Sequence, residues 1–217
     1  MHQFITAFTA ICFLIGILGG IPFLFWVIFT ALAKRWKKVG IQLGVAALLF
    51  GVVFGLNTWS NAQTKKSYVR GIFNTAASLG SPLKRVETDR AFNGDGYSFT
   101  VYELPLEVKE RFANFDTALK ETYPIRPEYR SGWQTSHWKQ GPHPEIDDSL
   151  ELKLAMPNYD GQTDGLKPDF EELKEILAGS EAFYSYFYKT QSDRPSNIDL
   201  FVIDLKGNRF FAINHNL

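Results

Sequence analysis

The sequence predicts an α+β protein in which two N-terminal transmembrane helices precede a mainly antiparallel sheet domain with two packed helices. Two observations lead to this prediction. Glu87 is the first acidic residue of the chain, and the residues before it contain two long apolar stretches. The C-terminal third contains short runs with the two-residue period of strands, separated by turn residues.

Charge divides the chain into two parts. Residues 1–65 carry five basic and no acidic side chains, a net charge of +5, whereas residues 66–217 carry eighteen basic and twenty-three acidic ones, a net charge of −5. Carboxylates are costly in hydrocarbon, so the first part is suited to a membrane. We expect a transmembrane helical hairpin at 1–65 and a soluble domain at 66–217.

The first apolar stretch, Phe4–Ala33, has thirty residues without a charged side chain. As a straight helix it would be about 45 Å long, against a hydrocarbon core of about 30 Å. Gly19, Gly20 and Pro22 lie in its middle and predict a kinked or tilted span. A cleaved signal peptide is the alternative, but the stretch has no basic region before it, is too long, and is followed by a basic cluster.

The second apolar stretch, Val39–Trp59, has the length of one span, about 31 Å as a helix. Trp36 and Trp59 lie near its ends, as aromatic residues do at membrane interfaces. Glycines recur in two pairs at four-residue spacing and form a smooth ridge for helix packing: Gly40, Gly44, Gly51 and Gly55. We expect the first span to pack on this ridge; oligomerisation through it is the alternative.

The basic cluster 34–38 between the two spans predicts the orientation. Basic loops are retained on the cytoplasmic side, so both termini and the soluble domain should be extracytoplasmic, in a multi-pass protein of a bacterial cell (inner) membrane. Lys65, Lys66 and Arg70 follow the second span directly and favour the opposite orientation.

In the soluble part, the sequence predicts a helix after the second span, a hairpin, and an amphipathic helix that opens at Pro105 with apolar residues at spacings of three and four. A second short helix begins with Pro168, which is favoured at a first helical position. The predicted segments are helix Ser67–Ala77, strands Leu83–Arg90 and Tyr97–Leu104, strand Leu150–Ala155, helix Pro168–Ala178, and a C-terminal meander of Ala182–Lys189, Ile198–Leu205 and Arg209–Asn214 with a buried middle strand.

The segment Tyr123–Asp148 is irregular and rich in proline and aromatic residues. Irregular stretches of this length within a compact domain are uncommon and are often functional. Aromatic side chains anchor many protein interfaces, which makes four of them candidate interaction residues: Trp133, Trp138, Tyr123 and Tyr129. The alternative is that they fold back and cover the core.

The segment 160–171 has spacing similar to a calcium-binding EF-hand loop. Asp160, Gln162 and Asp164 would occupy the first, third and fifth ligand positions, and Glu171 the bidentate twelfth. Gln162 departs from the usual Asp or Asn, and Lys167 replaces an apolar residue. We favour a polar turn before a helix and predict no cofactor; calcium is the alternative.

A second group of candidate metal or acid–base residues lies in the irregular segment: His137, His143, Glu145, Asp147 and Asp148. It has neither the helical histidine spacing nor the cysteine pair of common zinc sites, so we favour a solvated loop with incidental histidines over a metal site. The only cysteine, Cys12, lies in the first apolar stretch. The chain also lacks a nucleophile elbow and a phosphate-binding loop, so we predict no catalytic residue and favour a protein that is not an enzyme.

The turn Arg90–Tyr97, with Asn93-Gly94-Asp95-Gly96, and the hairpin strands Asn197–Asp204 and Asn208–Phe211 resemble those of a group of small bacterial membrane-anchored proteins. The resemblance covers about a fifth of the chain and consists of turns and core strands. It implies a fold; the group has no assigned activity, so no functional residue can be transferred.

Together these features predict a membrane-anchored, non-catalytic envelope protein whose extracytoplasmic domain binds another protein, for instance in an immunity-type role. The lipid bilayer is the other expected partner. The acidic domain has no run or helix face of basic residues, so nucleic acid is excluded as a partner. The alternatives are a metal-dependent envelope enzyme or calcium-binding domain, and a cytoplasmic-facing sensor coupled to the membrane helices.

Overall fold

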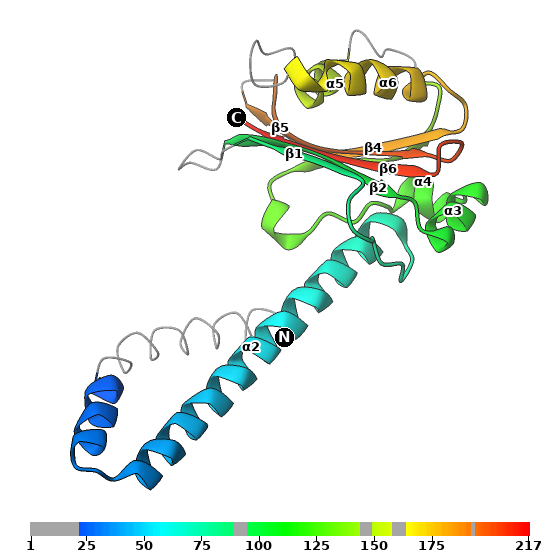
Figure 1. Ribbon diagram of the computed structural model, residues 1–217. Helices are drawn as coiled ribbons and strands as arrows, with labels where there is room; N and C mark the ends of the chain where they lie inside the picture. Colours follow the sequence, from blue (N-terminus) through cyan, green and yellow to red (C-terminus); the bar gives the residue numbers. More distant parts are fainter. Residues whose placement is uncertain (1–21, 89–94, 144–148, 158–163, 192–193) are drawn as a thin grey trace. The chain divides into compact units, whose positions relative to one another are not determined.

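The computed structural model describes residues 22–88, 95–143, 149–157, 164–191 and 194–217 (Figure 1). Contacts between Cα atoms divide the chain into two compact units, Met1–Lys65 and Lys66–Leu217.

The described part of the first unit is helical. A short apolar helix, Pro22–Leu32, is followed by Lys34 in a left-handed conformation (φ 56°) and then by α2, Trp36–Phe73. An 18-residue window of α2 has a mean hydropathy of 2.3, so this helix is long and apolar enough to cross a membrane. Pro22–Leu32 is shorter than a span, and residues 1–21 of the first predicted span lie outside the described residues.

The second unit is built on one antiparallel sheet of six strands, in the order β1-β2-β6-β5-β4-β3 (Figure 1). The α+β fold class and the antiparallel sheet are therefore confirmed. The hairpin and the C-terminal meander form as predicted, with β5 buried between β4 and β6. The strands are β1 Lys84–Glu87, β2 Gly96–Glu103, β3 Gln134–Gln140, β4 Ala182–Gln191, β5 Arg194–Asp204 and β6 Arg209–Asn216.

Helices cover both faces of this sheet. In Figure 1, α5 and α6 lie over one face, and α3 and α4 lie beside the other. The residues 66–73 at the end of α2 pack on the same face as α3 and α4. The helices of the second unit are α3 Leu106–Ala113, α4 Thr117–Glu121, α5 Leu150–Ala155 and α6 Lys167–Leu177, with the 3₁₀ turns η1 Glu128–Arg130 and η2 Asp164–Leu166.

The alternation of aromatic residues along β4 separates two hydrophobic clusters. Phe183 and Phe187 belong to the cluster under α3, whereas Tyr184, Tyr186 and Tyr188 face the cluster under α5 and α6. This follows from the geometry of a strand, in which successive side chains point to opposite faces. The sheet is thus buried on both sides.

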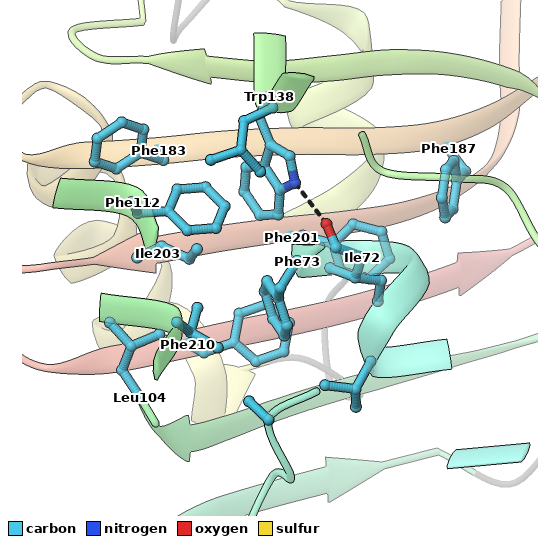
Figure 2. Packing of buried hydrophobic residues seen from close by; sticks show 14 of the residues in the cluster. Ile72, Phe73, Leu104, Phe112, Trp138, Phe183, Phe187, Phe201, Ile203 and Phe210 are labelled. Atoms are coloured by element: carbon cyan, nitrogen blue, oxygen red, sulfur yellow. Dashed lines mark hydrogen bonds between the residues drawn. The ribbon is translucent and has the colours of Figure 1, made fainter. Parts of the chain in front are cut away.

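The end of α2 is part of the hydrophobic cluster under α3 (Figure 2). Phe73 is fully buried, with its ring centroid 4.8 Å from that of Phe210, and Phe112 and Trp138 make an edge-to-face pair at 4.8 Å. The indole Nε1 of Trp138 donates a hydrogen bond to the main-chain oxygen of Ile72 (2.8 Å). A carbonyl in the last turn of a helix has no partner within the helix, so Trp138 satisfies a group that would otherwise be buried and unpaired.

Two predicted segments differ from the structure. Leu150–Ala155 forms a helix, α5, where a strand was expected, because the Ser149 hydroxyl accepts from the Leu152 amide (3.3 Å) and caps a turn that buries Leu152 and Ala155. The irregular segment contains the strand β3, which pairs with β4 and was not predicted.

Candidate functional site

Two of the predicted interaction residues belong to the core. Trp138 is 1% exposed, and its main-chain N–H donates to the oxygen of Tyr123 (3.0 Å). The half-buried Tyr123 packs against the same hydrophobic cluster. Both therefore adopt the alternative arrangement, in which the aromatic residues of the segment cover the core.

The other two, Tyr129 and Trp133, lie on either side of Arg130 in sequence and contact its guanidinium group. That group lies 3.8 Å from the ring centroid of Trp133 and 5.4 Å from that of Tyr129. Trp133 is buried, whereas Tyr129 is 70% exposed. The cation–π contacts thus position an aromatic ring in solvent on the short turn η1.

Arg130 is held in turn by Asp199 on β5. Its Nε and Nη2 atoms donate to the two carboxylate oxygens of Asp199, both at 3.1 Å, and the Asn214 side-chain amide also contacts this carboxylate. A two-pronged bond of this kind fixes orientation as well as position. Partial desolvation of the hydroxyl at the protein surface raises the pKa of the Tyr129 phenol, the charge of Asp199 adds to the effect, and that of Arg130 opposes it.

The described residues provide only parts of the predicted metal sites. Asp160 and Gln162 lie outside the described residues, Asp164 begins η2, and Glu171 is an exposed residue of α6 that pairs with Lys174 (Oε1–Nζ 3.0 Å).

The alternative group is equally incomplete. His137 Nδ1 lies 3.2 Å from the oxygen of Tyr123, and the His143 ring packs on Tyr184 with 4.7 Å between centroids. Glu145, Asp147 and Asp148 lie outside the described residues. Within the described part of the chain, no three His, Cys, Asp or Glu side chains are placed to hold a metal ion.

A groove of about 630 Å³ lies where the end of α6, the turn into β4 and the β5–β6 turn meet. We call it the acidic groove, because carboxylates predominate among its charged groups. It is lined by Glu172, Glu175, Ile176, Gly179, Ser180, Glu181, Ala182, Asp204, Lys206, Gly207 and Arg209.

Arg209 connects two of these carboxylates. Its Nη1 lies 2.8 Å from Glu172 Oε1, its Nη2 lies 3.0 Å from Asp204 Oδ2, and its guanidinium group stacks on Phe211 at 5.2 Å. Burial alone would lower the pKa of Arg209, but the bonds and charges of Glu172 and Asp204 outweigh it and raise that pKa. Arg209 therefore stays charged and bridges the two acids, and its single positive charge offsets one of their two negative charges.

The β5–β6 turn holds Asp204 in place. The Gly207 N–H donates to Asp204 Oδ1 (2.8 Å), and a Cβ at Gly207 would lie only 2.1 Å from Asp204 Oδ2. Asn208 adopts a left-handed conformation (φ 56°), which asparagine tolerates better than most residues. The carboxylate and the turn are thus mutually dependent.

Two further acids of the groove, Glu175 and Glu181, are exposed and form no ion pair among the described residues. They flank the C-terminal end of α6, where unpaired carbonyls give the helix its negative pole. A groove with two free carboxylates beside a helix C-terminus favours a cationic group.

Sequence reasoning did not find the acidic groove, because its residues come from three elements that only the fold brings together. The turn Lys206-Gly207-Asn208 was the only local signal. A scan against protein-family models, a search of curated proteins and a search of solved structures find no significant match to the chain.

Proposed function

We propose that this chain is a membrane-anchored, non-catalytic protein whose domain binds a partner protein, and that the acidic groove receives a basic segment of that partner. The observation that supports this most directly is the pair Glu175 and Glu181, which are exposed and form no ion pair among the described residues, in a groove lined by four acids and two bases. A lysine or arginine placed between them would bridge the two carboxylates, as Arg209 bridges the neighbouring pair of acids.

The anchor is α2, together with a first span that includes Pro22–Leu32. Leu48, Phe50 and Phe54 of α2 are more than half exposed, as are many of the large apolar side chains around them. Exposed apolar surface on this scale is unfavourable in water and favourable in a bilayer. With the loop 34–38 on the cytoplasmic side, the domain is extracytoplasmic in a bacterial inner membrane.

An immunity-type role fits this arrangement, because anchoring raises the effective concentration of the domain where an incoming protein reaches the membrane. The domain carries a net charge of −5, which attracts a basic partner over several ångströms before contact.

A pull-down from membranes tests the proposal. The full chain should enrich a partner that an anchor-only chain, residues 1–65, does not, and the double variant Glu175→Lys/Glu181→Lys should lose it. Glu110→Lys/Glu121→Lys makes the same charge change at exposed positions on α3 and α4 and should retain it. Enrichment equal to that of the anchor-only control, or equal loss in both double variants, would refute binding at the groove.

A second function, sensing coupled to the membrane helices, is favoured by one observation. The helix α2 runs without a break from the apolar stretch to Phe73, which is fully buried in the domain core. A displacement of the helix end would therefore disturb the packing of the sheet. Cysteine labelling at Ser149 in intact cells distinguishes the two topologies: labelling by a membrane-impermeant reagent places the domain outside, whereas protection until lysis places it in the cytoplasm.

A further inference from the structure

We propose that a basic surface beside the end of α2 binds the anionic headgroups of the bilayer. We call it the basic collar, and it consists of Lys66, Arg70, Ile125, Arg126 and Tyr129. The inference rests on the proposed membrane anchoring, and it assigns the exposed Tyr129 to contact with lipid. It adds a second attachment of the domain to the membrane, independent of the acidic groove.

Main-chain contacts bring the two segments of the collar together. The Ile125 N–H donates to the oxygen of Gly71 at 2.7 Å, and a Cβ at Gly71 would lie 3.4 Å from the oxygen of Ile125. Arg126 follows Ile125, and Arg70 precedes Gly71, so the two arginines come from adjoining stretches of main chain. The collar is thus formed by the fold and is not a run of sequence.

The loop part of the collar is fixed at both ends. At one end, the N–H of Trp138 on β3 donates to the oxygen of Tyr123 (3.0 Å). At the other end, Arg130 makes its two bonds to Asp199. The collar residues between them are therefore presented by a positioned loop, which lowers the entropy lost on binding a surface.

The charge of the collar is opposite to that of its domain. Lys66, Arg70 and Arg126 are exposed and form no ion pair among the described residues. The two segments 66–71 and 123–130 contain four basic residues and one acid, Glu128. Arg130 is paired with Asp199, and the other three basic residues together with Glu128 give a net charge of +2 within a domain of net −5. Anionic headgroups are the complement of such a surface.

The collar also exposes apolar surface of the kind found at membrane interfaces. Ile125 is 51% exposed and Tyr129 is 70% exposed. Tyrosine is enriched at this depth because its ring is apolar and its hydroxyl is polar. An acidic protein could satisfy the charges of the collar, but an anionic bilayer satisfies both the charges and the apolar side chains and is already required by the anchor.

The chain length after the second predicted span permits the contact. Lys66 and Arg70 follow Trp59 by seven and eleven residues, which is a chain length of about 10 and 16 Å in helical form. The potential of an anionic surface extends about 8 Å beyond the headgroups at physiological salt. Each basic side chain near such a surface strengthens association about fivefold.

Native mass spectrometry of the full chain tests the proposal, with lipid retention measured after incubation in equal amounts of phosphatidylglycerol and phosphatidylcholine. The wild type should retain phosphatidylglycerol preferentially, and Lys66→Glu/Arg70→Glu/Arg126→Glu should lower that preference at least about tenfold. Lys139→Glu/Lys189→Glu/Arg194→Glu reverses three exposed charges outside both the collar and the acidic groove and should leave it unchanged. Circular dichroism of both variants verifies that they fold.

Two outcomes would overturn the inference: equal lipid preference in the wild type and the collar variant, or equal loss in both variants. An acidic protein captured by the wild type, without any lipid preference, would also overturn it in favour of a protein partner. Failure of the anchor itself is distinguishable, because the chain would then be extracted from membranes by alkaline carbonate. If the chain resists extraction but shows no lipid preference, the membrane anchor is correct and lipid binding by the collar is refuted.

Discussion

Replacing Trp138 by phenylalanine removes the indole N–H that bonds to Ile72 at the end of α2 (Figure 2). The Ile72 oxygen then stays buried without this donor, which costs about 1–3 kcal/mol. The smaller ring also loses packing against Phe73 and Phe112, at about 1 kcal/mol. We expect the free energy of unfolding to fall by about 3 kcal/mol.

Urea unfolding of the full chain in detergent micelles, followed by near-UV circular dichroism, measures this change. Amide exchange adds a local readout, because the Asn74 N–H, which donates to the oxygen of Arg70 (2.9 Å), should exchange faster. Trp133→Phe is the matched control, since Trp133 is also buried but lies under Arg130.

A benzothienylalanine at position 138 separates the contribution of the hydrogen bond from that of ring packing, because it keeps the ring shape and replaces the N–H by sulfur. It should retain the packing and lose the hydrogen bond, giving a cost of about 1–3 kcal/mol. If this analogue were as stable as the wild type, the bond to Ile72 would not secure the end of α2.

Three further predictions concern the domain. Arg130→Ala leaves the buried Asp199 carboxylate without its cation and should cost about 3 kcal/mol in denaturant unfolding, more than Asp199→Asn does; equal costs would contradict this. Burial lowers the pKa of His215, so its contribution to stability is present above about pH 6.5 and is lost as the pH falls. His215→Gln should therefore reduce the amount by which the free energy of unfolding decreases between pH 7 and pH 5. If the variant lost as much stability as the wild type over this range, His215 would not be the group responsible. Gly141→Ala places a Cβ 2.2 Å from the main-chain oxygen of Gly179 and should cost about 1–3 kcal/mol, which thermal unfolding would measure; an unchanged melting temperature would show that the main chain yields there.

The meander could be predicted from sequence because its pattern is local. In β4, phenylalanine and tyrosine alternate, and the two residue types lie in different hydrophobic clusters. The buried β5 is apolar on both faces from Leu200 to Ile203. Strands that carry their own period and lie next to one another in sequence need no distant information to be recognised.

The segment Leu150–Ala155 was wrongly predicted as a strand because six residues are too few to distinguish the two-residue period of a strand from the 3.6-residue period of a helix. Leu150, Leu152 and Leu154 alternate as in a strand, but the residues that become buried are Leu152 and Ala155, three apart. The Ser149 cap decides between the two, since it satisfies an amide at the start of the helix.

The strand β3 and the acidic groove could not be predicted for a different reason. β3 has no apolar period of its own, and its partner β4 lies more than forty residues further along the chain. Its Trp138 was predicted to be an interface residue because aromatic residues are common both in protein cores and in protein interfaces, and the sequence alone does not separate the two. Burial, which separates the two cases, depends on the end of α2 lying beneath it.

The basic collar and the acidic groove are separated along the sheet, and this separation has an electrostatic consequence. Asp199, which holds the collar loop through Arg130, and Asp204, at the groove, are five residues apart on β5, about 17 Å along the strand. That distance is about twice the screening length at physiological salt. Carboxylates at the groove would therefore add little repulsion to the proposed contact between the collar and anionic lipid, and the collar would hardly weaken the proposed attraction of the groove for a basic segment. A domain of net charge −5 can in this way lie against an anionic surface at one end and bind a cationic partner at the other.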